Sequence, residues 1–180
     1  MTVWVKSRLP NYNRRSRPPD PAKKVLIAEK LQKILDQGYV VFPAERSFVQ
    51  SLMDFFDVEK GSDIRMVYNG TSCGLNDVLY APNFWLPTQA SAARVLGYGY
   101  YMVDIDLGER FLNFPLPFVL QRYSGIDVST LKQEVNDNRD LESFYAETNT
   151  KAWANWNRCW MGLKPSPYMA VRFYYLAEEF

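Results

Sequence analysis

Asp104 and Asp106 are the two residues of this sequence best suited to chemistry. They lie in the run Tyr-Met-Val-Asp-Ile-Asp-Leu at 101–107, whose other positions are apolar or aromatic. Because side chains two positions apart in a strand share a face, both carboxylates would point the same way. An unpaired carboxylate is costly to bury, so the pair needs a cation, hydrogen-bond donors or water. The pattern therefore indicates either the solvated end of a strand or a metal site.

The composition limits which metal such a site could hold. The chain of 180 residues contains no histidine and two cysteines, Cys73 and Cys159. Histidine-dependent catalytic triads and histidine-rich zinc sites are therefore excluded. We expect both cysteines to be free thiols in a reducing intracellular compartment, cytoplasmic or nuclear. A metal would need oxygen ligands, which favours Mg²⁺, Mn²⁺ or Ca²⁺.

The N-terminal residues are strongly basic, although the whole chain has a net charge of +1. Residues 1–24 contain seven lysines or arginines and one aspartate. We expect residues 1–19 to form an irregular arm in which Arg14, Arg15 and Arg17 contact a nucleic acid. The alternative is a solvated, disordered leader without a partner. No apolar run approaches the roughly 20 residues that span a bilayer, and no secretory signal is present, so we expect no membrane association.

A helix is expected between Asp20, which can cap it, and Gly38, which can end it. Pro21 suits the first turn of this helix. The periodic apolar positions predict the face that packs on the core. These positions are Val25, Ala28, Leu31, Ile34 and Leu35.

Hydrophobic periodicity and turn residues predict the remaining elements. Two alternating apolar runs flank Gly61-Ser62-Asp63 and predict a β-hairpin. Ser166 and Pro167 predict the start of a helix that continues to the last residue. The other expected elements are a strand at 39–43, irregular chain at 71–88, a helix at 89–96, a strand at 100–108, its neighbouring strand at 122–129, and loop with some helix at 130–157.

Four stretches, in the same chain order, resemble motifs of reverse transcriptases of the retrotransposon type. DIDLGERFLNFPL at 104–116 resembles the first catalytic motif, in which an aromatic residue follows the strand-ending Asp by five positions. Here these two residues are Asp106 and Phe111. The stretch VEKGSDIRMVYNGTSCGLN at 58–76 resembles the fingers hairpin and its Leu-Asn pair. The stretch NFWLPT at 83–88 resembles the segment that leads to the palm. The stretch RCWMGLKPSPY at 158–168 resembles the motif with a Gly and a Ser-Pro pair.

The resemblance implies transfer of deoxynucleotides to a primer end by two-metal chemistry. Asp106 would be a catalytic carboxylate, and Asp106 with the backbone carbonyl of Leu107 would bind Mg²⁺ or Mn²⁺. Asp104 would support this site from outside the ligand shell. Phe111 would lie beneath the sugar and exclude a 2′-hydroxyl. The resemblance also implies that Lys60 and Arg65 clamp the phosphates of the nucleotide. The backbone amides near Glu109 and Arg110 would face the triphosphate. Gly162 would allow close backbone approach to the base or template, and Lys164 would contact a phosphate.

The implied fold is α+β, with a reverse-transcriptase-like fingers hairpin and an incomplete palm of antiparallel sheet and packed helices. We expect a basic arm at 1–19, a fingers-like region at 20–90 and a partial palm at 91–180. The family's third motif, an aromatic residue shortly before Asp-Asp, is absent from the sequence. We therefore expect a fragment that is inactive alone. Its partners would be an RNA or DNA template-primer, a deoxynucleoside triphosphate and the missing palm and thumb portion of the polymerase.

Several positions depart from the family pattern and leave other interpretations open. Asn69 lies where Asp is usual, Arg110 where small residues are common and Met161 where Gln is common, which weakens the expectation of efficient catalysis. One alternative is a non-catalytic remnant that still binds nucleic acid. Another is an unrelated α+β protein, in which Lys60, Arg65 and Asp106 would not face one cleft.

The tryptophans near the C-terminus also allow two interpretations. Trp153, Trp156 and Trp160, together with Arg158, could stack on the bases of a single strand. The favoured interpretation is that these aromatics are packing residues. Without the resemblance, Phe111 would also be a core aromatic. Lys60 and Arg65 would likewise be ordinary exposed charges of a hairpin.

Overall fold

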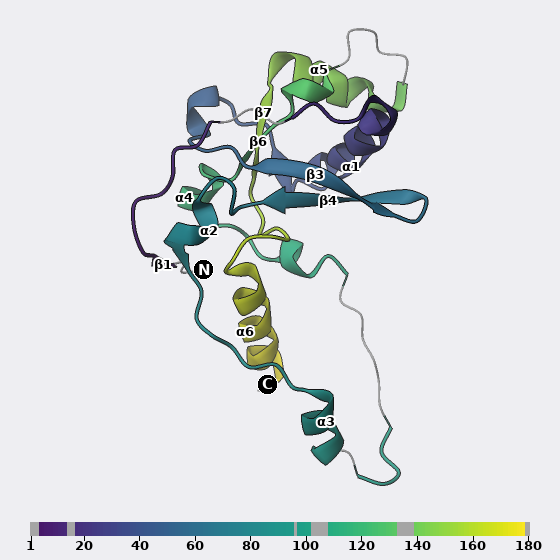
Figure 1. Cartoon of the computed structure of the whole chain (residues 1–180), viewed down its shortest axis with the longest axis vertical. Helices are drawn as coiled ribbons and strands as arrows, with labels where there is room; N and C mark the ends of the chain where they lie inside the picture. The colour runs from purple at the N-terminus through teal and green to yellow at the C-terminus, as the bar shows by residue number, and fades with distance from the viewer. Residues whose placement is uncertain (1–3, 14–16, 96, 102–107, 133–138, 179–180) are drawn as a thin grey trace.

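The computed structural model describes residues 4–13, 17–95, 97–101, 108–132 and 139–178 (Figure 1). Its helices alternate with small antiparallel sheets, which confirms the α+β class. Among these residues, no helix has both the length and the apolar character that crossing a bilayer requires. The division into an arm, a fingers-like region and a partial palm stays a prediction.

The helices and strands are short apart from α1, α6 and the hairpin. The α-helices are α1 (Lys24–Asp36), α2 (Leu75–Val78), α3 (Gln89–Val95), α4 (Phe118–Gln121), α5 (Glu142–Thr150) and α6 (Ser166–Glu178). The 3₁₀ turns are η1 (Pro21–Lys23), η2 (Arg46–Phe48), η3 (Arg110–Asn113), η4 (Ser129–Leu131) and η5 (Arg139–Leu141). The strands are β1 (Trp4–Val5), β2 (Val40–Val41), β3 (Asp54–Lys60), β4 (Asp63–Asn69), β5 (Leu79–Tyr80), β6 (Gly125–Asp127) and β7 (Trp153–Trp156).

The first helix lies within the predicted range, but α1 itself begins at Lys24, after the 3₁₀ turn η1 that Asp20 caps. An Asp20 carboxylate oxygen accepts a hydrogen bond from the Ala22 amide at 3.0 Å. Gly38 follows the helix with φ of 68°, a left-handed conformation that glycine adopts without strain. The predicted apolar face is wrong at Val25, which is 41% exposed, whereas Ile27 is buried. The buried face is therefore rotated relative to the prediction.

The β3–β4 hairpin forms as predicted and is tied to α1. Lys60 pairs with Asp63 across the two-residue turn, and the two strands contain seven residues each. The ammonium of Lys23 lies 3.0 Å from carboxylate oxygens of both Asp57 and Glu59. These two bonds, the one to Glu59 first, raise the pKa of Lys23. The ion pairs fix one face of the hairpin against the helical N-terminal region.

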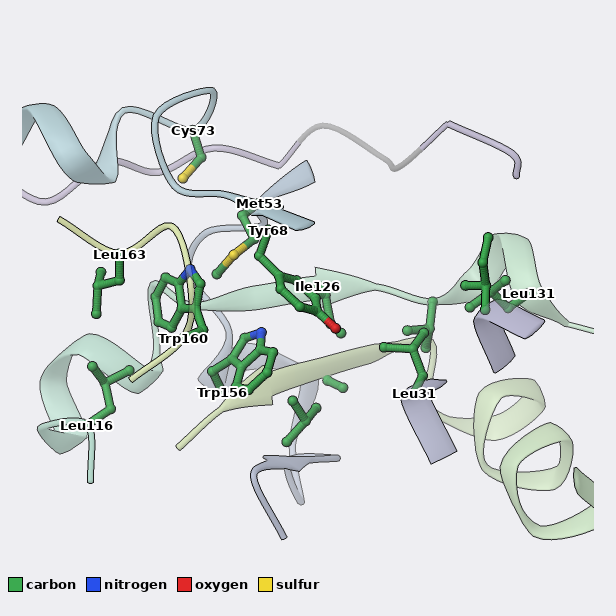
Figure 2. Close-up of a cluster of buried hydrophobic side chains, with 14 of the residues drawn as sticks. Leu31, Met53, Tyr68, Cys73, Leu116, Ile126, Leu131, Trp156, Trp160 and Leu163 are labelled. Atoms are coloured by element: carbon green, nitrogen blue, oxygen red, sulfur yellow. The ribbon is translucent and has the colours of Figure 1, made fainter. Parts of the chain in front are cut away.

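A three-stranded sheet in the order β2-β7-β6 forms the centre of the molecule. Its strands come from both sides of residue 90, and the core lies against it (Figure 2). Trp156 and Trp160 are 2% and 0% exposed, and the Tyr68 ring meets Trp156 edge-on at 4.8 Å. Base stacking by Trp156 and Trp160 is therefore wrong, because their rings are packed inside the core.

Three segments predicted to be irregular contain regular structure. Strand β1 pairs antiparallel with β5, so the arm at 1–19 is partly docked on the segment 71–88. Residues 71–88 also contain α2, and the segment 130–157 contains β7 in addition to the expected helix. In each case the strand is short, and its partner lies far away along the chain. Local periodicity carries little signal for such pairings.

The strand prediction at 122–129 is confirmed as β6, but its neighbours differ from the expectation. β6 pairs with β7 on one side. On the other side Gly125 exchanges backbone hydrogen bonds with Ser51 and Met53 at 3.0 and 2.8 Å. Most of the strand predicted at 100–108 lies outside the described residues. The helix predictions at 89–96 and from Ser166 are confirmed as α3 and α6.

Both cysteines are free and buried, as expected for structural thiols. Burial raises the pKa of Cys159 to about 11 and also raises the pKa of Cys73. Neither residue therefore has the thiolate character that nucleophilic or redox chemistry requires.

Candidate functional site

The predicted metal ligands Asp106 and Leu107 lie outside the described residues, as does Asp104. Arg14 and Arg15 of the arm lie outside them too, and Arg17 is exposed. Within the described ranges, no group of three acidic or cysteine side chains is placed to hold a metal ion. The predicted nucleotide-binding residues that the structure describes are Lys60, Arg65, Glu109, Arg110, Phe111, Gly162 and Lys164.

The cations Lys60 and Arg65 lie on the same face of the hairpin. Directly opposite residues of an antiparallel pair share a face, and Arg65 is opposite Val58, two residues before Lys60. Both side chains are exposed, and neither forms a salt bridge with a described residue. The other face of the hairpin is covered, since Ile64 and Tyr68 are 5% and 7% exposed. The hairpin therefore presents two cations to solvent on a surface that also carries exposed apolar side chains.

Helix α1 links the hairpin turn to the turn that follows the predicted catalytic strand. The Lys30 ammonium lies 2.6 Å from Asp63, and this bond lowers the pKa of Asp63. One helical turn later, the Lys33 ammonium lies 3.8 Å from Glu109. The tip of the hairpin and the turn at 108–111 therefore border the same side of α1. These are the two segments that the resemblance places around one nucleotide.

The turn at 109–111 has an unusual backbone and a packed aromatic residue. Glu109 has φ of 52°, the only positive value outside glycine among the described residues. The Tyr39 hydroxyl donates to the Glu109 carboxylate at 3.3 Å. The Arg110 guanidinium lies 4.9 Å from the Tyr174 ring centroid, and Phe111 is partly buried against the core. These contacts attach the turn to both α1 and α6.

The loop at 161–164 contacts the hairpin at Gly162, a position where only glycine fits. Gly162 has φ of 108°, and a β-carbon built there would lie 2.3 Å from the Tyr68 carbonyl oxygen. No other residue fits this contact without a backbone shift. Gly162 therefore permits a close approach to the protein's own backbone, whereas the sequence predicts an approach to a base or template. The group that Gly162 approaches is the carbonyl oxygen of Tyr68, near the end of β4. Contact between Gly162 and a nucleotide stays a prediction.

Asn76 joins the Leu-Asn pair to this loop, a contact that the sequence analysis did not predict. Its side-chain amide donates to the Gly162 carbonyl at 2.8 Å, and its side-chain oxygen accepts from the Lys164 amide at 2.9 Å. The Lys164 ammonium donates to the Asn76 carbonyl at 3.3 Å. Lys164 thus has a structural partner, and its contact with phosphate stays a prediction. The one feature of the sequence that could have indicated a role for Asn76 is its place in the Leu-Asn pair of the family motif. No local pattern indicates its contacts, since the partners of Asn76 lie more than 80 residues away.

Searches against models of protein families and against curated protein sequences find no match for this chain.

Proposed function

We propose that this chain is a reverse-transcriptase-like module that binds a deoxynucleoside triphosphate and a template-primer. The observation that carries the proposal is the pair Lys60 and Arg65, both exposed on one face of a two-residue hairpin. The base of that hairpin contacts Gly162 through Tyr68. The stretches that resemble the fingers hairpin and the Gly and Ser-Pro motif are thus adjacent in space. This adjacency supports a shared nucleotide site.

The proposed site acts on the triphosphate through charge. Ammonium and guanidinium groups bind phosphate oxygens through charge-assisted hydrogen bonds, and Arg65 can do so with two parallel bonds. Such cations also stabilise negative charge that develops during phosphoryl transfer. When bound through Asp106 and Leu107, Mg²⁺ would neutralise the same phosphates and activate the primer hydroxyl. The role of Lys60 and Arg65 in this proposal is to hold and orient the substrate.

Phe111 supplies the proposed selectivity for the sugar. Its ring is partly buried and packs against the core. A ring fixed in this way can reject a 2′-hydroxyl by steric clash. We infer that deoxynucleotides are preferred over ribonucleotides.

This sequence does not contain the motif that would supply the further carboxylates of a two-metal site. Two magnesium ions need ligands beyond one aspartate, and the sequence contains no aromatic residue followed by Asp-Asp. We therefore propose that the chain binds substrate but does not extend a primer by itself. The missing palm and thumb portion of a polymerase is its proposed partner.

A non-catalytic nucleic-acid-binding role is the second candidate. The exposed side chains of Arg8 and Arg17 favour it, because they belong to the basic segment at the start of the chain. Affinity from such contacts falls steeply with salt concentration.

Calorimetric titration with dATP, dADP and dAMP in the presence of Mg²⁺ tests the leading proposal. We expect saturable binding in which the triphosphate binds about tenfold more tightly than the monophosphate, because the hairpin cations contact the terminal phosphates. ATP should bind more weakly than dATP because of Phe111. Absence of saturable dATP binding, or equal affinity for dATP and dAMP, would contradict the proposal. Salt-sensitive binding of an oligonucleotide without dATP binding would support the second candidate.

A further inference from the structure

A cavity of about 450 Å³ lies between the segment at 43–46, the end of β6 and the connection from α5 to β7. This volume is in the range of pockets that hold small ligands. Its lining contains none of the described residues to which the resemblance assigns a role. In Figure 1, β6, β7 and α5 lie together, away from the tip of the hairpin. The cavity is therefore separate from the proposed polymerase site.

Three cationic side chains line this cavity, and all of them reach solvent. Arg46 and Lys151 are exposed, and Lys132 is partly exposed. Among the described residues that line the cavity, Asp127 alone is acidic. Asp127 is 1% exposed, so its carboxylate is closed to a ligand. The charged groups that a ligand can reach are therefore all positive, and they favour an anion.

The guanidinium of Arg46 is held in place while its donors stay free. Its central carbon lies 3.9 Å from the centroid of the Trp153 ring. The side chain forms no hydrogen bond or salt bridge with another described residue. Stacking uses the face of the guanidinium, whereas its five N–H bonds point outward in the plane. Arg46 can therefore bind a phosphate group through two parallel hydrogen bonds.

The two lysines also keep donors for a ligand. The Lys132 ammonium donates to the Asn149 carbonyl at 3.2 Å, and the Lys151 ammonium lies 3.4 Å from the Glu147 carboxylate. Each ammonium group has three N–H bonds, so neither lysine is saturated by these contacts. The pair of Lys151 and Glu147 joins two half-exposed side chains, and a pair of this kind contributes little stability. Together with Arg46, the lysines match a group that carries two negative charges.

The remaining lining of the cavity suits a flat organic group. It includes the apolar side chains of Pro43, Ala44, Ala152 and Trp153. Trp153 is only partly buried. Guanidinium and indole planes both stack on the rings of ligands. A ligand that carries a ring beside its anionic group would therefore use both parts of the wall.

We propose that this cavity binds a small phosphate monoester that carries a flat ring. The phosphate accepts hydrogen bonds from Arg46, Lys132 and Lys151. The ring stacks against the platform that Arg46 and Trp153 form. Nucleoside monophosphates and aryl phosphates share this chemistry. The inference does not depend on the polymerase proposal, because it uses neither a divalent metal ion nor the hairpin.

Calorimetric titration of the full chain without divalent metal tests this inference, with phenyl phosphate, phenyl sulfate, inorganic phosphate and AMP as probes. At about pH 8 a phosphate monoester carries close to two negative charges, whereas phenyl sulfate has the same ring with one. We expect phenyl phosphate to bind about tenfold more tightly than phenyl sulfate, which is the effect of one added charge-assisted hydrogen bond. Inorganic phosphate, which lacks the ring, should bind about fivefold more weakly than phenyl phosphate.

Arg46→Lys tests the role of the guanidinium, because it keeps the charge but removes the planar set of donors. It should weaken binding of phenyl phosphate by about tenfold. The double variant Lys132→Gln/Lys151→Gln should weaken it at least as much. Arg172→Lys on α6 is the matched control, since Arg172 is exposed and does not line the cavity. This control should leave the affinity unchanged.

Four results would overturn the inference. They are no saturable binding of phenyl phosphate, equal affinities for phenyl phosphate and phenyl sulfate, equal affinities for phenyl phosphate and inorganic phosphate, and an unchanged affinity for phenyl phosphate in folded Arg46→Lys. Thermal melting shows whether Arg46→Lys is folded, and if it is not, the lysine double variant decides in the same way. AMP distinguishes the two sources of the ligand. Tighter binding of AMP than of phenyl phosphate identifies a nucleotide, and the reverse order identifies an aryl phosphate.

Discussion

Gly162→Ala is expected to lower the free energy of unfolding by about 3 kcal/mol or more. Two costs add at this position: the backbone has φ of 108°, and the new β-carbon would lie 2.3 Å from the Tyr68 carbonyl oxygen. Because that oxygen belongs to the backbone of β4, it cannot move aside without disturbing the hairpin. For a chain of 180 residues, the expected fall in melting temperature is roughly 6–12 °C. Thermal unfolding followed by circular dichroism measures it.

Gly61→Ala is the matched control for this prediction. Gly61 has φ of 63°, but a β-carbon built there meets no atom within 4 Å. The control therefore contains the conformational cost, about 1–2 kcal/mol, without the clash. If Gly162→Ala is no more destabilising than Gly61→Ala, the close contact between the 161–164 loop and the hairpin is wrong.

The double variant Lys60→Ala/Arg65→Ala is expected to weaken dATP binding in Mg²⁺ by about tenfold, to the affinity of dAMP. Both side chains are exposed on one face of the hairpin and form no salt bridge with a described residue. Their removal should therefore leave the melting temperature nearly unchanged. Binding of dAMP should change little, because the cations are proposed to contact the terminal phosphates. Titration calorimetry of the variant with both nucleotides measures these differences.

The double variant Arg94→Ala/Arg172→Ala also removes two positive charges, but from exposed positions on α3 and α6. This control separates a local contact from the general attraction between a cationic protein and an anion. Equal losses of dATP affinity in the two double variants would show that Lys60 and Arg65 are ordinary surface charges.

The hairpin and the long helices could be predicted from the sequence because their signals are local. Gly61 sits between two alternating apolar runs, and Asp20 and Gly38 mark the two ends of the first helix. Local chemistry fixes each of these features before any distant contact forms. The buried face of α1 was predicted less well at Val25, because the direction of packing depends on the hairpin and not on the helix itself.

Features that depend on distant partners could not be predicted in this way. The docking of β1 on β5 joins residues more than 70 positions apart, and the strand β7 contains the polar residue Asn155 within WANW. The bonds from Asn76 to the 161–164 loop arise only when the chain has folded. Trp153 differs from Trp156 and Trp160 only in its tertiary position, which no local pattern specifies.

Under the proposed function, Asp106 and the cations Lys60 and Arg65 bind one complex of a divalent metal ion and a nucleotide. Electron paramagnetic resonance of Mn²⁺ in the presence of dATP tests it on the full chain, with Asp106→Asn as the variant. The asparagine keeps the size of the side chain but removes the charge that a divalent cation prefers. The account predicts that Asp106→Asn weakens binding of Mn²⁺ with dATP by about tenfold or more, at an unchanged melting temperature. The same Mn²⁺ affinity in both proteins would contradict it.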